Sequence, residues 1–197
     1  MRYILITLFF LSTLFASSTD DIKANFNTIT KDVLNIVKDK TKEIQIRDKE
    51  VIDIITPMFD FKLMARLTLG KLWRKLDKNT QNKFVDIYIK RMKQSYSSKL
   101  NSYSDEKIVI NYAKQLKSNR ITLSTSIVSK TDNLEITYKY YKTKHKLSNK
   151  NRWLVYDIII KGSSVIKTDK KQFNDYLKEH NILELMDFLK NKLNIDA

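Results

Sequence analysis

The chain has 197 residues, enough for one domain with a substantial hydrophobic core. It contains no cysteine, which excludes disulfide bonds, thiol catalysis and cysteine-bound metals. Its 37 lysine and arginine residues outnumber 22 acidic residues and give a net charge of +15. Few of the basic residues are arginine, which reads base edges best, so we do not expect nucleic-acid binding. The charge fits either a generally lysine-rich composition or attraction to anionic membranes and acidic partners.

The first 18 residues have the pattern of a cleaved secretory signal peptide. Arg2 gives a basic start, an almost wholly apolar run follows from Tyr3 to Phe15, and Ala16 to Ser18 supply small residues for cleavage. The apolar run is shorter than a typical membrane span, although an uncleaved N-terminal anchor is the alternative. We therefore expect a signal peptide over residues 1–18 and one exported domain over residues 19–197.

Helical periodicity dominates the first half of the exported chain. An amphipathic helix capped by Asp20 or Asp21 is expected to reach Val37. A shorter helix opened by Asp48 follows and ends at Pro57, the only proline of the chain.

Residues 59–103 predict two further helices, separated by a polar break at residues 77–80. Asp60 is the expected N-cap of the first of them. The second carries an apolar or aromatic side chain at every fourth residue, namely Phe84, Tyr88, Met92, Tyr96 and Leu100. Because four residues turn a helix by about 400°, this stripe drifts by about 40° at each step. One end of the helix is therefore expected to pack on protein and the other to line a cavity.

From residue 107 onward the period of the sequence changes from helix to strand. Four strands are predicted at residues 107–114, 120–129, 134–146 and 152–161. Short polar connections between them indicate an antiparallel meander, and helical patterns return after Gly162. The predicted class is α+β, with N-terminal helices, a four-stranded antiparallel meander sheet, closing C-terminal helices, and an apolar cavity between sheet and helices.

Two separated motifs carry a resemblance to a known family. The first is Phe59-Asp60-Phe61, followed by Met64-Ala65-Arg66, Leu69-Gly70, Trp73-Arg74, Gln81, Phe84, Tyr96 and Tyr103. The second runs from Trp153 to Ile158 and continues with Gly162-Ser163-Ser164 and Gln172-Phe173. Their order and spacing resemble the MlaC family of periplasmic phospholipid-binding proteins, also called toluene-tolerance auxiliary components. The chain departs from the family at Asp169-Lys170, where a Tyr-Arg pair is usual.

The resemblance implies a soluble, monomeric carrier that moves phospholipid across the periplasm. Its partners would be an inner-membrane ABC-transporter complex with an MCE-domain ring and an outer-membrane lipoprotein–porin complex. Its role would be to maintain the lipid asymmetry of the outer membrane. The acyl chains would lie in a pocket between sheet and helices, with the headgroup outside, and the lipid would be cargo, with no cofactor.

A lipid carrier has a simple physical task. Two acyl chains with about thirty methylenes, at about 0.8 kcal/mol each, would cost on the order of 24 kcal/mol to leave in water. The site must therefore be mostly apolar. The predicted lipid-binding residues come from the helical stripes and from the apolar face of the meander: Phe61, Met64, Phe84, Ile87, Tyr88, Met92, Tyr96, Leu100, Ile110, Leu123, Ile136, Tyr138, Tyr156, Ile158 and Ile160. For each of these residues, a place in an ordinary packed core is the alternative.

The remaining polar residues give little support to catalysis. Asp157 lies in an otherwise apolar strand, and we expect it to form a structural ion pair with Arg66 or Arg74. The chain lacks a Gly-x-Ser-x-Gly elbow, and His145 and His180 have no metal-ligand spacing, so neither an enzyme nor a metal site is predicted. The alternatives to a phospholipid carrier are an exported binding protein for another apolar ligand, such as a fatty acid or solvent, and a lipid hydrolase.

Overall fold

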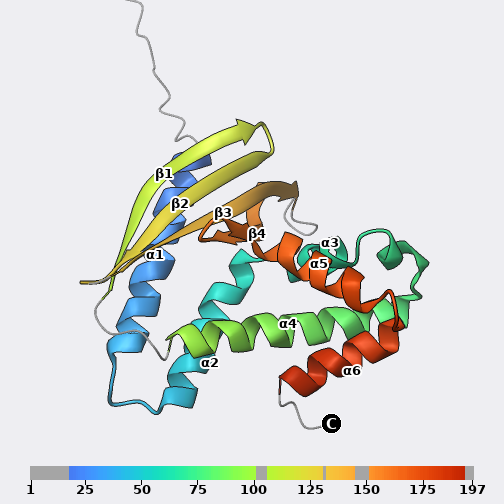
Figure 1. The fold of residues 1–197 in the computed structure, drawn as a ribbon. Coiled ribbons are helices and arrows are strands. Elements are labelled where there is room, and N and C mark those ends of the chain that lie inside the picture. Colours follow the sequence, from blue (N-terminus) through green and yellow to red (C-terminus); the bar gives the residue numbers. More distant parts are fainter. Residues whose placement is uncertain (1–17, 101–105, 131, 145–150, 194–197) are drawn as a thin grey trace, which may run out of the picture.

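The computed structural model describes residues 18–100, 106–130, 132–144 and 151–193, without the side chains of residues 96–100, 144 and 151. A twisted antiparallel sheet lies above a set of helices (Figure 1). The helices are α1 (Ser18–Lys38), α2 (Ile44–Ile55), η1 (Thr56–Met58), α3 (Phe61–Leu69), η2 (Leu72–Lys75), α4 (Lys78–Leu100), α5 (Val165–Tyr176) and α6 (Ile182–Lys192). The strands are β1 (Lys107–Lys117), β2 (Arg120–Val128), β3 (Asn133–Lys144), β4 (Asn151–Ile160) and β5 (Ser163–Ser164). The predicted α+β class and the meander are confirmed.

The sheet has five strands in the order β1-β2-β3-β4-β5, so the prediction of four strands is wrong. After β4 the chain turns sharply at Lys161 and Gly162, both with positive φ angles of 48° and 78°. Ser163 and Ser164 then pair with Ile160 and Ile159 before α5 begins. A strand of two residues is too short to show an alternating pattern, which is why the sequence did not reveal it.

One face of the sheet carries continuous apolar rows that run across the strands. Residues paired directly across antiparallel strands lie on the same face. One row joins Thr125, Ile136 and Ile160, and the next joins Leu123, Tyr138 and Ile158. Ile110 extends the first row because it is paired with Thr125. These rows contribute to the hydrophobic core, which the helices complete.

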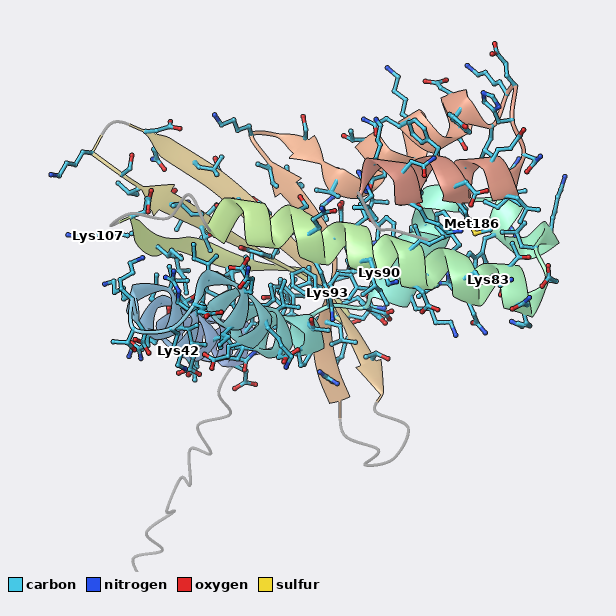
Figure 2. All side chains as sticks on the ribbon, turned by 90° about the horizontal axis from the view of Figure 1, so that it is seen from below. Lys42, Lys83, Lys90, Lys93, Lys107 and Met186 are labelled. Carbon is cyan, nitrogen blue, oxygen red and sulfur yellow. The ribbon has the colours of Figure 1, made fainter. Side chains whose placement is uncertain are left out.

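The helices cover the apolar face from below. Figure 1 shows α4 running beneath the sheet, with α1 and α2 towards one end and α5 and α6 towards the other. Seen from below in Figure 2, α4 crosses in front of the strands, and Met186 lies where α6 runs beside it. Met186 is buried there, as are Leu185 and Leu189 of the same helix. The space beneath β3 and β4 is therefore bordered by α4, α5 and the end of α6.

The α3 segment begins and ends as its sequence predicts. The Asp60 carboxylate accepts a hydrogen bond from the backbone N–H of Leu63 at 2.8 Å, which confirms this residue as the N-cap. Phe61, Met64 and Leu69 are buried, so the apolar side of this helix faces the core. Gly70 closes the helix with φ +55° and ψ −119°, a conformation that is nearly exclusive to glycine.

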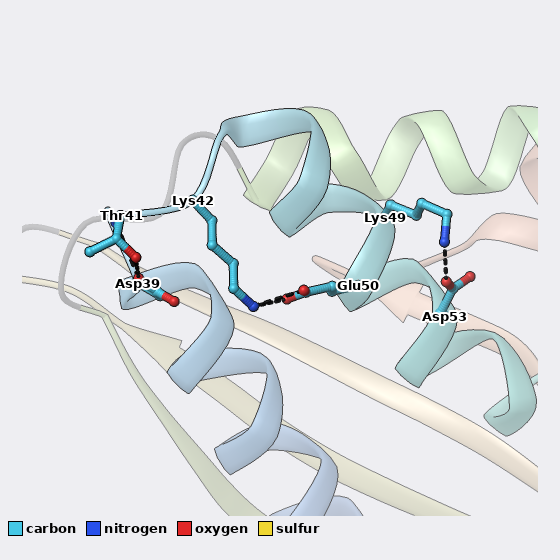
Figure 3. Close-up of polar contacts among 6 residues, drawn as sticks. All are labelled: Asp39, Thr41, Lys42, Lys49, Glu50 and Asp53. Carbon is cyan, nitrogen blue, oxygen red and sulfur yellow. Dashed lines mark hydrogen bonds and ion pairs between the residues drawn. The ribbon is translucent and has the colours of Figure 1, made fainter.

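The first two helices begin earlier than predicted. α1 starts at Ser18, ahead of the two expected caps, and α2 starts at Ile44, so Asp48 lies inside α2 and does not cap it. Local hydrogen bonds stabilise the turn between them, because the N–H and the hydroxyl of Thr41 both donate to the Asp39 carboxylate (Figure 3). Lys42 then forms an ion pair with Glu50 at 2.7 Å, which ties the turn to α2.

No helix within the described residues is both long and apolar enough to cross a membrane. The predicted signal peptide lies almost entirely outside the described residues, as does Tyr103 of the first motif. The signal peptide and the single domain over residues 19–197 therefore stay predictions.

Candidate functional site

A partly open cavity of about 670 Å³ lies between α4, the strands β3 and β4, and the helices α5 and α6. We call it the apolar cavity. Its walls are mostly hydrophobic side chains: Met92, Ile136, Tyr138, Ile158, Ile160, Val165 and Leu193. Five further described residues of the lining are exposed to solvent, and all five are polar: Gln94, Ser95, Ser163, Thr168 and Lys192. An apolar interior with a polar rim suits a ligand that has one hydrophobic part and one polar end.

Five of the predicted lipid-binding residues share this cavity. They are Met92 from α4, Ile136 and Tyr138 from β3, and Ile158 and Ile160 from β4. The two cross-strand rows explain the grouping, since the pairs Ile136–Ile160 and Tyr138–Ile158 stand side by side on the covered face. The side of β3 on which the sequence alternation placed Ile136 and Tyr138 is therefore the side that lines the cavity. Whether these residues bind lipid stays a prediction.

Seven other predicted residues lie in or against the packed core and do not line the cavity. Phe61, Met64, Phe84, Ile87, Tyr88 and Leu123 are buried, and Ile110 is half-buried against the core. Phe84 shows why, because its ring packs edge-on to Phe173 of α5, with 6.0 Å between the ring centroids. The first half of α4 thus packs on other helices, while Met92, further along, reaches the cavity.

Tyr156 does not face the apolar cavity, because a β-bulge interrupts the alternation of β4. Lys139 is paired with Asp157 but the next residue, Tyr140, is paired with Val155, so Tyr156 is the extra residue. Its ring lies edge-on to Tyr141, with centroids 6.0 Å apart. The guanidinium of Arg120 also lies over this ring, 5.4 Å from its centroid. Tyr156 is therefore part of an aromatic and cationic cluster elsewhere on the sheet. The side chains of Tyr96 and Leu100 lie outside the described part of the chain.

The wall of the cavity contains an ion pair that sequence reasoning missed. Arg91 of α4 donates two hydrogen bonds to Asp169 of α5, from Nη1 to Oδ2 at 2.9 Å and from Nη2 to Oδ1 at 2.8 Å. The hydroxyl of Tyr88 donates a third hydrogen bond to Oδ2 at 3.1 Å. The Asp169 side chain is only 3% exposed, against 29% for Arg91. The sequence did hold one signal, since Asp169 falls on the apolar stripe of α5 between Ile166 and Phe173.

The environment of this ion pair shifts the pKa values of two of its members. Burial raises the pKa of the Tyr88 hydroxyl well above its ordinary value, and the Asp169 carboxylate adds to this effect. Burial alone would lower the pKa of Arg91, but the hydrogen bonds and charge of Asp169 outweigh it and raise the pKa. Tyr88 therefore remains a neutral donor and Arg91 remains a cation at every physiological pH.

The predicted partner of Asp157 is wrong. The carboxylate pairs with Lys139, directly across the β3–β4 ladder, at 3.1 Å. It also accepts hydrogen bonds from the Ser164 hydroxyl at 2.9 Å and from the backbone N–H of Ile166 at 3.3 Å. Since Asp157 alternates with the cavity-lining Ile158, it lies on the other face of the strand. The expectation of a structural ion pair is met, but with a lysine whose proximity depends on the strand register.

A second hollow, of about 800 Å³ and more open, lies beside α3, η2 and the start of α4. We call it the basic hollow, because the described residues that line it include no acidic residue and five exposed cations: Arg66, Lys71, Arg74, Lys78 and Lys170. None of the five forms an ion pair with another described residue. Its floor is fixed by Gln81, whose side chain donates to the backbone carbonyls of Trp73 at 2.8 Å and Leu76 at 3.1 Å.

Within the described residues, no group of three or more histidine, cysteine, aspartate or glutamate side chains is arranged to hold a metal ion. His180 stacks on Tyr176 with 4.2 Å between ring centroids and lies 3.7 Å from Glu184. These contacts belong to the α5–α6 turn, remote from the residues that line the apolar cavity.

A partly open apolar cavity with a polar rim, framed by a sheet and helices, is the geometry of a binding protein for an apolar ligand. The family model described as MlaC protein matches residues 27–191 of the sequence. The chain therefore belongs to the MlaC family, and the predicted resemblance is confirmed.

Comparison with solved structures gives the same fold. The structure of the phospholipid-binding protein from Ralstonia solanacearum in complex with a phospholipid is similar, with a TM-score of 0.74 and 21% sequence identity. The similarity covers 87% of this chain and 96% of that chain. No curated protein matches the sequence.

Proposed function

We propose that this protein is a soluble periplasmic phospholipid carrier. The single observation that carries the proposal is the apolar cavity, whose volume of about 670 Å³ lies between the sheet and α4 in a chain of the MlaC family. Pockets for small apolar ligands have volumes of about 300–1,000 Å³. The similar fold from Ralstonia solanacearum was solved with a phospholipid bound, which supports the choice of ligand.

The same proposal includes a route for the lipid. The carrier would exchange phospholipid with an inner-membrane ABC-transporter complex bearing an MCE-domain ring and with an outer-membrane lipoprotein–porin complex. It would thereby maintain the lipid asymmetry of the outer membrane. Family membership supports these partners, and the mechanism asks only for binding and release, with no bond broken in the lipid.

The test is to extract purified protein with organic solvent and to identify the released molecules by mass spectrometry. We expect intact two-chain phospholipids, and we expect delipidated protein to take up phospholipid from vesicles. Free fatty acids alone would support a binding protein for single-chain ligands. Hydrolysed lipid that accumulates with time would support a hydrolase. No phospholipid and no uptake from vesicles would overturn the proposal.

A pair of variants tests whether the ligand binds in the apolar cavity. Ile160→Arg puts a charge on a half-buried wall residue, and an unpaired charge in an apolar site costs several kcal/mol. We expect the co-purified lipid to fall by at least about tenfold. The matched control is Val109→Arg, because Val109 is 46% exposed on β1 and does not line the cavity. Equal lipid in both variants would mean that the ligand lies elsewhere.

A further inference from the structure

The charged residues of the apolar cavity are few and are not balanced. Of the described residues that line it, only Arg91, Asp169 and Lys192 carry charge, so two cations face one anion. Lys192 lies over the ring of Phe188, 4.6 Å from the centroid, and forms no ion pair with a described residue. The described part of the lining therefore has a net charge of +1, and its other members are apolar or neutral.

Asp169 restricts the position of the Arg91 guanidinium through its hydrogen bonds. Both of its oxygens accept hydrogen bonds from the guanidinium, and Oδ2 also accepts the bond from Tyr88. An arginine has five N–H donors, and Asp169 uses only two of those on Arg91. The other three find no acceptor among the described residues. The face of the guanidinium is also restricted, because it lies over the ring of Phe173, 5.8 Å from the centroid.

A purely structural role explains this arrangement poorly. If the pair served only to join α4 to α5, two apolar side chains of similar volume would do so equally well or better. Arg91 instead lines the cavity and retains three donors that Asp169 leaves unused. A planar group with paired N–H donors matches the oxygens of a phosphate group, and such charge-assisted bonds are strong.

We propose that Arg91 binds the phosphate group of the carried lipid, that Asp169 and Tyr88 hold its guanidinium in place, and that Lys192 supplies a second positive charge at the rim. The cavity then selects lipids that carry a phosphate over lipids with the same acyl chains and none. The inference rests on the proposed function, because the phosphate reaches Arg91 only when the acyl chains occupy the cavity.

The experiment compares the affinities of two lipids with identical acyl chains, phosphatidylethanolamine and diacylglycerol. Both have no net charge, so the overall charge of the protein favours neither, and their affinity ratio reports the contribution of the phosphoethanolamine headgroup. The variant is Arg91→Met with Asp169→Leu, which removes both charges and leaves no buried carboxylate unpaired. We expect the ratio to fall by about 10- to 100-fold, because hydrogen bonds to a charged group are lost, while diacylglycerol binding is retained.

The matched control removes the other buried ion pair. Lys139→Met with Asp157→Asn neutralises a pair on the opposite face of β4, and the amide still accepts hydrogen bonds from Ser164 and Ile166. This control is expected to leave the affinity ratio at the wild-type value. A second variant, Arg91→Lys, retains the pair with Asp169 but loses the planar donors, and its ratio is expected to fall as well.

The outcomes separate this inference from the proposed function. An unchanged affinity ratio in a folded Arg91→Lys protein or in the folded double variant would overturn the role of Arg91. Tight binding of both lipids with equal affinity by the wild-type protein would also overturn it, although the carrier function would stand. Failure of the wild-type protein to bind either lipid would overturn the carrier function itself.

Discussion

The apolar cavity and the basic hollow have similar volumes, about 670 and 800 Å³, but their linings come from different sources. The lining of the cavity is collected from α4, β3, β4, α5 and α6, elements that are far apart in the chain. Four of the five cations around the hollow come instead from one stretch, residues 66–78. The hollow is thus encoded locally, whereas the cavity exists only when the sheet and the helices have assembled.

This difference in lining predicts that the two surfaces bind different kinds of partner. Apolar walls bind through area removed from water, at about 25 cal/mol per Å², and are insensitive to salt. Exposed cations bind through long-range attraction that salt screens over about 8–10 Å. We therefore expect the cavity to hold cargo and the basic hollow to face anionic membranes or acidic partners.

The largest expected effect comes from placing the same carboxylate in each region. Met92→Glu introduces a charge into the apolar cavity, and we expect lipid affinity to fall on the order of 100-fold because the carboxylate would be desolvated. Lys71→Glu is the matched variant, since its side chain is exposed among the cations of the hollow. Equilibrium binding of a fluorescent phospholipid measures both. Similar losses in the two variants would remove the distinction between the regions.

Removing two cations of the hollow gives the next effect. Lys71→Ala with Arg74→Ala is expected to weaken binding to anionic vesicles by about 2 kcal/mol, since each basic residue near the surface contributes about 1 kcal/mol. The matched control is Lys83→Ala with Lys90→Ala, two exposed lysines further along α4 (Figure 2). Vesicle sedimentation at several salt concentrations measures both. Equal losses would mean that the attraction follows net charge alone and not the hollow.

Backbone strain at the rim of the hollow gives a smaller effect. Gly70→Ala forces alanine into φ +55° and ψ −119°, and we expect a loss of about 1–3 kcal/mol of unfolding free energy. The new Cβ would lie 3.2 Å from Cε of Lys170, a flexible side chain that can move away, so the strain is in the backbone. Urea denaturation measures the change. Wild-type stability in this variant would show that the turn relaxes, and unchanged lipid affinity is expected.

The smallest effect comes from a single hydroxyl beside the cavity. Tyr88→Phe removes the donor to Asp169 and is expected to cost about 1 kcal/mol of stability, measured by urea denaturation. Tyr140→Phe is the matched control, because its buried hydroxyl has no hydrogen-bond partner among the described residues. Its removal is expected to be neutral or stabilising. A loss in Tyr140→Phe as large as that in Tyr88→Phe would contradict the role given to the Asp169 bond.

Patterns with a regular period were read correctly from the sequence. Three of the four long strands, the helix behind Asp60 and the two closing helices follow from periodic apolar residues, and β4 follows from a continuous apolar run. The face of β3 that lines the cavity followed from alternation at Ile136 and Tyr138. What broke the period was missed, namely the bulge at Tyr156 and the short strand β5. A bulge adds one residue without any composition signal, so alternation alone assigns the extra residue, here Tyr156, to the wrong face.

Contacts between distant segments were the other failure. Arg91 and Asp169 are 78 residues apart, and nothing in either local sequence states that α4 and α5 lie side by side. The partner of Asp157 was wrong for the same reason, because Lys139 comes within reach only through the register of β3 on β4. An acidic residue on an apolar stripe signals that a buried partner exists, but not which one.

The sequence by itself determined the family, the α+β class and the basic character of residues 66–78, because these depend on residue type and spacing along the chain. Only the tertiary structure decided which apolar residues line a cavity and which fill the core. Apolar residues of the cavity and of the core are both stabilised by removal from water. The periodicity of a helix or strand therefore identifies the buried face but does not show what covers that face. Met92 and Tyr88 lie one turn apart on the same helix, yet one reaches the cavity and the other is enclosed between α4 and α5.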